Sequence, residues 1–363
     1  MTLFENDGHN WYRIPSLVTT PAGTLIATCD RRKGSCDDHG QDADVVMRRS
    51  LDGGASWEAT ATLATKEGAT LHSGPSLVDG RTGRLFKFFR VSPRVPDHRA
   101  LFNEERDHWR RWREWGAGSF VIHSDDEGST WSGPRRLDIE HPDATLPPRI
   151  GNSVHGIQLH DGTLVVPASC SCADHFEHNA DLPSRSFLLL SMDGGETWQT
   201  GAAWAPGYAH MEFAVAETRN GGVYVNQRSL GPCRRVLWID DIRGEPDPLV
   251  PDPQLPEPVC HAGLHRTGDR LFFVNPRIAN DTRKCREDTR RNLTLQFSDD
   301  DGRTWIPSRT ITRGPAGYAD LAGLADGFVA CLYECGEQRS CERIDFVALD
   351  GFTAGDPSVR DGT

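Results

Sequence analysis

The chain has 363 residues and a formal net charge of −12, with 36 glycines and 23 prolines. The acidic balance argues against nucleic acid as a partner, because phosphate binding needs a basic face. An anionic ligand would have to be held by a local group of arginines. No apolar run of about 18 residues occurs, so we expect no membrane span.

The first residues, Met-Thr-Leu-Phe-Glu, do not read as a signal peptide. For the chain as given we therefore expect a cytoplasmic location, or secretion if a leader has been removed. We also expect a monomer that needs no cofactor.

One eight-residue pattern, Ser-X-Asp-X-Gly-X-Ser/Thr-Trp, occurs four times, at residues 50–57, 124–131, 191–198 and 298–305. Each copy has turn chemistry, since its Asp can bond nearby backbone amides, its Gly can take a positive φ and its Trp can anchor the turn. Because the pattern repeats whereas an active site occurs once, we interpret these residues as scaffold.

The spacing of the copies predicts the number of repeats. The longest interval, between the third and fourth copies, has room for a repeat that lost its motif, and the segment after Trp305 has room for another. Six repeats of four antiparallel strands fit this length at roughly 40 to 50 residues each. We therefore predict an all-β chain, a six-bladed β-propeller of four-stranded antiparallel blades, in a single domain over residues 1–363.

The first predicted blade contains an unusual arginine. Arg13 stands between Tyr and Ile at the start of an apolar strand over 11–18, although arginine is seldom buried without a partner. A second strand over 24–29 leads into a polar loop, 30–40, which holds Arg32, Asp37 and Asp38.

These segments resemble the exo-sialidases, which hydrolyse terminal sialic acids. The resemblance rests on Tyr-Arg-Ile-Pro at 12–15, Asp-His-Gly at 38–40 and the first repeat motif, which is similar to that family's Asp box. It implies a six-bladed propeller and an exo-glycosidase acting on terminal α-linked sialic acid or a related 2-keto-3-deoxy sugar acid, with a glycan as partner.

The second blade carries an insertion over 93–115, with Trp109, Trp112 and Trp115 at helical spacing. We expect a helix there, which either packs its tryptophans on the propeller or forms a lid over the site.

The later blades carry further segments that resemble the family in the same order. Glu212 begins one strand and Arg228 ends the next, while Glu217 falls on the opposite strand face and is expected to be structural. Arg290 resembles the third arginine of the family, with Arg277 as the alternative.

In the last blade, Tyr318 resembles the catalytic tyrosine, and Glu334 is expected to pair with Arg13. The resemblance thus covers nearly the whole chain.

The chemistry implied by the resemblance is consistent with these residue types. Three arginines, Arg13, Arg228 and Arg290, can hold a carboxylate with fixed charge and fork geometry, and Arg32 is a further substrate-binding residue. Because the substrate carries its carboxylate on the carbon that is attacked, a neutral phenol is a better nucleophile than a carboxylate.

The catalytic roles follow from that argument. Tyr318 is the expected nucleophile and Glu212 its general base. Asp38 is the expected acid/base, with Asp37 as the alternative, and the anomeric configuration should be retained. A lectin-like propeller that binds sialic acid with little or no catalysis remains the alternative function, although it would not need all three of these residues.

The cysteines suggest two other roles, disulfide bonding and metal binding, and the sequence argues against both. The ten cysteines are scattered, so we expect thiols rather than disulfides. Cys170, Cys172, His175 and His178 match no common zinc spacing, so no metal site is predicted. The run Ser-Cys-Ser-Cys at 169–172 replaces the larger side chains found in some sialidases, which predicts a wider glycerol end of the pocket.

Overall fold

The computed structural model describes residues 1–38, 40–94, 116–139, 148–150, 154–171, 184–205, 207, 212–278 and 290–349, with only the backbone at 148, 149, 171, 184 and 326. The regular elements among these residues are strands, apart from one short 3-10 helix, Ala325–Gly327. Among them, no helix has the length and apolarity that crossing a bilayer requires. The all-β prediction is confirmed.

Apart from the long strand β22, the strands have ten residues or fewer. They pair mainly with their neighbours in the sequence. Those of the first half are β1 (Thr2–Glu5), β2 (Asn10–Thr19), β3 (Leu25–Lys33), β4 (Ala43–Ser50), β5 (Ala61–Ala64), β6 (Ala69–Val78), β7 (Leu85–Pro93), β8 (Gly118–Ser124), β9 (Arg135–Arg136), β10 (Pro148–Arg149), β11 (Ile157–Gln158) and β12 (Leu164–Ser171). Those of the second half are β13 (Ser184–Ser191), β14 (Gln199–Trp204), β15 (Phe213–Glu217), β16 (Val223–Gln227), β17 (Cys233–Ile239), β18 (Val250–Pro256), β19 (Gly263–Thr267), β20 (Arg270–Pro276), β21 (Arg291–Ser298), β22 (Ile306–Gly323), β23 (Val329–Cys335) and β24 (Arg343–Leu349).

Hydrogen bonds join the described strands into four sheets: β2 to β9, β10 to β14, β15 to β18, and β19 to β24 together with β1. Three of these sheets have more than four strands, for local reasons. In the sheet of β10 to β14, both β10 and β11 pair with β12. A single parallel pair, Ala43 with Thr70, joins β4 to β6. The long strand β22 pairs with β21 through its first part and with β23 through its second.

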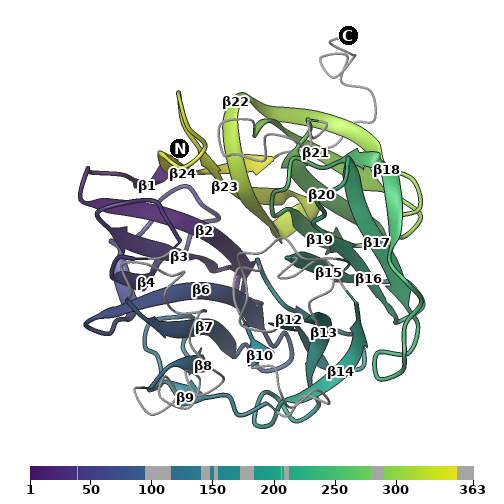
Figure 1. Cartoon of the computed structure of the whole chain (residues 1–363), viewed down its shortest axis with the longest axis horizontal. Helices are drawn as coiled ribbons and strands as arrows, with labels where there is room; N and C mark the ends of the chain where they lie inside the picture. Colours follow the sequence, from purple (N-terminus) through teal and green to yellow (C-terminus); the bar gives the residue numbers. More distant parts are fainter. Residues whose placement is uncertain are drawn as a thin grey trace.

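The sheets follow one another in chain order around a common centre (Figure 1). Apolar side chains from each group of strands pack on the next group; for example, Leu188 of β13 shares a core with Phe213 of β15. The last group packs on the first in the same way, since Phe346 of β24 shares a core with Leu25 of β3. The N-terminal strand β1 completes the last group by pairing with β24.

The repeated motif forms the same turn in all four copies. In the first copy, the Asp52 carboxylate accepts bonds from the backbone amide (2.9 Å) and the hydroxyl (2.5 Å) of Ser56. Gly54 has φ of 93°, and a Cβ there would overlap the ring of Phe346 in the neighbouring group. The turns therefore hold local structure and inter-sheet packing, in agreement with a scaffold role.

Candidate active site

Glu212 and Arg228 lie next to each other because they flank two strands that pair with one another. Glu212 precedes β15 and Arg228 follows β16, and these antiparallel strands pair Phe213 with Gln227. The backbone amide of Arg228 donates to the carbonyl of Glu212 (2.9 Å), and its Nη1 donates to Glu212 Oε2 (2.7 Å). Two residues that lie 16 positions apart in the chain thus form one ion pair.

Tyr318, in β22, brings its phenol to this ion pair. Its hydroxyl donates to the Glu212 carboxylate, with Oη 2.6 Å from Oε1 and 2.8 Å from Oε2. The same oxygen accepts a bond from Arg228 Nη1 at 2.9 Å. A phenol held between a proton acceptor and a fixed cation is arranged to lose its proton when a substrate reacts.

Arg13 is held near Tyr318 by Glu334. Arg13 Nε donates to Glu334 Oε1 at 2.7 Å, and the pair is almost completely buried. Glu334 also accepts the backbone amides of Ile14 (2.9 Å) and Tyr318 (3.2 Å). One buried carboxylate therefore positions both the arginine and the tyrosine, and the expected contact between Glu334 and Arg13 is present.

Arg290 completes a group of three guanidinium groups around the tyrosine. The Cζ atoms of Arg290 and Arg13 lie 5.4 and 5.8 Å from the centre of the Tyr318 ring. Arg290 Nη2 donates to the carbonyl of Val259 at 2.7 Å. Arg277, the alternative, is exposed, whereas Arg290 is buried.

Two of these arginines have a side-chain nitrogen with no hydrogen-bond acceptor among the described residues. The Nε atoms of Arg228 and Arg290 are buried and have no acceptor within the described part of the chain. A buried donor without an acceptor is costly.

Backbone strain also concentrates at this place. Ile14 and Val259 both have positive φ, 61° and 55°, a conformation that β-branched residues rarely adopt. Their backbone groups contact Glu334 and Arg290, respectively. Strain held by surrounding structure is typical of functional sites.

The charges set the proton state of the tyrosine. Burial, followed by the negative charge of Glu212, raises the pKa of Tyr318 well above its usual value, and the nearby arginines Arg228 and Arg290 only partly offset this. Burial lowers the pKa of Arg228, but Tyr318, in its ionised form, and the carboxylate of Glu212 outweigh burial and hold it well above its usual range. The resting site thus contains a neutral phenol and a charged guanidinium.

Arg32 anchors the loop that carries Asp38. It is 1% exposed and donates to Asp30 Oδ2 (2.9 Å), the carbonyl of Cys36 (2.6 Å) and Asp38 Oδ1 (2.8 Å). Sequence reasoning missed Asp30, although its position two residues before Arg32 in β3 puts both on one strand face. Arg32, expected to bind substrate, here holds protein groups.

The two candidate acids differ in their contacts. The side chain of Asp38 is 60% exposed while bound to Arg32. Asp37 is also exposed, and its carboxylate accepts a bond from the hydroxyl of Ser35 (2.9 Å) within the same loop. The structure therefore links Asp38, through Arg32 and the Cys36 carbonyl, to Arg13, whose Nη1 donates to the same carbonyl (3.2 Å).

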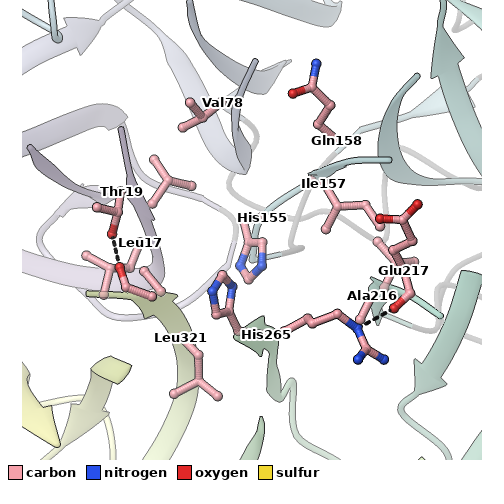
Figure 2. Close-up of a pocket in the computed structure, with 16 residues that line it drawn as sticks. Leu17, Thr19, Val78, His155, Ile157, Gln158, Ala216, Glu217, His265 and Leu321 are labelled. Carbon is pink, nitrogen blue, oxygen red and sulfur yellow. Dashed lines mark hydrogen bonds between the residues drawn. The ribbon is translucent and has the colours of Figure 1, made fainter. Parts of the chain in front are cut away.

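A separate cavity of about 380 Å³ lies further along the same strands (Figure 2). Leu17, Glu217 and Leu321 line it. Leu17 follows Arg13 in the chain, Glu217 follows Glu212 and Leu321 follows Tyr318. Figure 2 shows the rings of His155 and His265 side by side in this cavity, with centroids 5.7 Å apart. Glu217 accepts the backbone amide of His160 (2.8 Å), which agrees with a structural role.

Several sequence predictions fall outside the described residues. These are the insertion from residue 95 to 115 with its tryptophans, His39, Cys172, His175 and His178. Within the described part of the chain, no group of three or more metal-binding side chains occurs, and the cysteines there are thiols, among them Cys170.

Comparison with known proteins places the chain in a defined group. Residues 23–331 match the family described as "BNR repeat-like domain". The chain is 29% identical over 377 residues to a sialidase from Micromonospora viridifaciens, covering 98% of this chain and 55% of that protein. It is 30% identical over 353 residues to a sialidase from Bacteroides fragilis (strain YCH46), covering 91% of this chain and 61% of that protein.

Among solved structures, the Hadza microbial sialidase Hz136 is similar with a TM-score of 0.76 and 26% identity. The match covers 93% of this chain and 65% of that one. The chain thus spans somewhat over half the length of the two bacterial relatives and about two thirds of this structure.

Proposed function

The chain belongs to the family of sialidases that carry BNR (Asp-box) repeats, and we propose that it is an exo-glycosidase that removes terminal α-linked sialic acid, or a related 2-keto-3-deoxy sugar acid, from glycoconjugates. The observation that carries the proposal is the Tyr318 hydroxyl held 2.6 Å from Glu212 and 2.9 Å from Arg228. Few roles other than proton transfer from the phenol explain that arrangement in a group of arginines.

The scaffold in this proposal is a closed six-bladed propeller. Its support is the cyclic packing, in which β24 packs on β3 and β1 pairs with β24. The two largest sheets each divide into two blades. In one, the boundary lies between β4 and β6, and in the other it lies within β22, between the part that pairs with β21 and the part that pairs with β23.

Arg13, Arg228 and Arg290 bind the substrate carboxylate in this mechanism. The convergence of the three arginines on Tyr318 and the burial of Arg13 and Arg290 support that role. Guanidinium groups stay charged at any physiological pH and match a carboxylate with two parallel bonds. This local cluster resolves how a chain of net charge −12 would bind an anion.

Tyr318 attacks the anomeric carbon while Glu212 takes its proton. The neutral phenol avoids the repulsion that a carboxylate nucleophile would meet from the substrate's own carboxylate, and tyrosine is the known exception among glycosidases for sialidases. Two displacements at one carbon give net retention of configuration. The charge that develops on the phenolate is stabilised by Arg228.

Asp38 supplies the proton to the leaving sugar and later activates water. Its exposure leaves it accessible to the departing group, and Arg32 fixes one of its oxygens. Asp38 is preferred to Asp37 because Asp37 bonds within its own loop.

The first test is turnover of a fluorogenic aryl α-sialoside, with the product's anomer followed by NMR. We expect hydrolysis with retention. If the protein binds an unsaturated sialic acid analogue but releases no fluorophore, the lectin-like alternative holds instead.

The preferred sugar acid is a separate part of the proposal. The small residues at 169–172 favour a wider glycerol end of the pocket, so deaminated neuraminic acid or a shorter ulosonic acid should also be hydrolysed. The loss of one hydroxyl contact shifts preference by only about 1 to 3 kcal/mol. Aryl glycosides of N-acetylneuraminic, N-glycolylneuraminic, deaminated neuraminic and octulosonic acids, assayed side by side, test this; a preference above about a hundredfold for the first would contradict it.

A further inference from the structure

Two cysteines that are far apart in the sequence meet beside the candidate active site. The sulfurs of Cys36 and Cys341 lie 3.3 Å apart across a sequence separation of 305 residues. Both side chains are buried, Cys36 at 6% exposure and Cys341 at 0%, and both are thiols in this structure. A disulfide needs sulfurs about 2 Å apart, so an approach of roughly 1 Å would bring them to bonding distance.

The segments that carry these cysteines are connections rather than strands. Cys36 lies in the loop after β3, and Cys341 lies in the turn between β23 and β24. Loops accommodate small shifts more easily than paired strands do. The required approach is therefore possible without breaking a sheet.

Cys36 is directly coupled to the site. Its carbonyl accepts bonds from Arg13 (3.2 Å) and Arg32 (2.6 Å), and Arg32 also holds Asp38 at 2.8 Å. A constraint on Cys36 is thus a constraint on the loop that carries Asp38.

Cys341 sits on a firmly held turn. The Glu342 carboxylate accepts the backbone amides of Glu337 (2.8 Å), Gln338 (3.0 Å) and Arg339 (2.8 Å). The preceding strand, β23, contains Glu334, the partner of Arg13. The turn therefore offers a rigid anchor to which the loop can be tied.

Arg339 makes Cys36 the better candidate for the first reaction. Its Nη2 lies 3.6 Å from Cys36 Sγ, so a positive charge stands next to the sulfur that attacks the disulfide. Cys36 is also the slightly more exposed of the two.

We propose that Cys36 and Cys341 are a reversible thiol–disulfide modification site, oxidised by a small-molecule disulfide, and that the bond fastens the Asp38 loop to the β23–β24 turn. The Cys36 thiolate attacks one sulfur of oxidised glutathione and expels one glutathione thiolate. Cys341 then attacks the Cys36 sulfur and expels the second glutathione thiolate, which takes up the proton of Cys341. Two protein thiols thereby lose two electrons, which reduce one glutathione disulfide to two thiols.

The proposal does not depend on the hydrolase activity, and its test uses none. The full chain is incubated with oxidised glutathione, digested without reduction and mapped by mass spectrometry, and its thermal midpoint is measured before and after. We expect a peptide that links Cys36 to Cys341, its loss on treatment with dithiothreitol, and a midpoint higher by at least about 2 °C in the oxidised form, because the link restricts the unfolded chain.

Three variants control the result. Cys36→Ser and Cys341→Ser should each abolish the linked peptide and the rise in midpoint. Cys233→Ser, at a partly exposed thiol in β17, should leave both unchanged. Glutathione attached to Cys36 without the link, a link to a different cysteine, no reaction, or an unchanged midpoint in the linked wild type would each overturn the proposal.

Discussion

The strands that surround the centre of the molecule carry charged and candidate catalytic side chains at one end and mostly apolar side chains at the other. At one end, Arg13 and Tyr318 belong to β2 and β22, and Glu212 leads into β15. At the other end the same strands contribute mostly apolar residues to the cavity of Figure 2.

The difference lies in the charge around the central side chains. At the far end, the Thr19 hydroxyl donates to the carbonyl of Gly323 (2.6 Å), and burial lowers the pKa of His265 to about 3, so that this residue is neutral. At the site end, charged arginines surround a phenol. The same strands thus support a mostly apolar end and an end built around charged groups.

The largest expected effect comes from removing the phenol. Tyr318→Phe should lower kcat by at least about a thousandfold, roughly 4 kcal/mol of transition-state stabilisation, because no nucleophile replaces the hydroxyl. Steady-state kinetics with an aryl sialoside measure the loss, and binding of an unsaturated analogue should survive.

A matched control lies at the other end. Val215→Ala, in the wall of the cavity, should lower stability by roughly 1 to 3 kcal/mol and leave kcat/KM within about twofold. Wild-type turnover in the Tyr318 variant would refute the mechanism, and a large loss of kcat in the Val215 variant would remove the functional contrast between the two ends.

The next effect concerns the acid. Asp38→Asn should lower kcat by about a hundredfold for a sugar leaving group, within the range that general acids contribute. The loss should be smaller for an aryl leaving group, which departs without a proton. Rates for both substrate types check this, with Asp37→Asn as the control; a larger loss in the control would transfer the role to Asp37.

The carboxylate clamp should respond less strongly. Arg290→Lys should reduce kcat/KM by roughly ten- to a hundredfold, since a point charge cannot replace the paired bonds of a guanidinium. Arg277→Lys, at an exposed position, should stay near the wild-type value. If the two variants rank in the reverse order, Arg277 is the third arginine.

The smallest effect is a dependence of stability on pH. Burial, followed by the positive charge of Arg234, lowers the pKa of His261 to about 3, against a usual value near 6.5. Below pH 6.5 the unfolded chain binds a proton that the folded chain excludes, so stability is full above 6.5 and declines toward pH 3. At pH 5 this residue should account for a loss of up to about 2 kcal/mol.

Urea unfolding at pH 7 and pH 5 measures that loss. The difference between the two pH values should be smaller in His261→Gln than in the wild type. An equal difference would show that His261 does not carry this effect.

The sequence by itself determined the local features of this protein. The repeated turns were predictable because each Asp bonds to residues at most four positions away, and the glycine requirement is a property of one residue's φ. All-β structure followed from the same short-range signals. The site residues were found through resemblance to a family. The number of residues between them in the sequence does not predict how far apart they lie in space.

Only the tertiary structure decided which residues touch. The resemblance predicted that Glu334 pairs with Arg13, but not that it also binds the backbone of Tyr318. Nor did it predict that Cys36 meets Cys341 across 305 positions, which happens because β2 packs beside β23 and β24. Such contacts arise when distant segments share one core, which no local pattern encodes. The burial of Arg32 beneath the Asp38 loop was decided in the same way, since a side chain's partners depend on every segment that surrounds it.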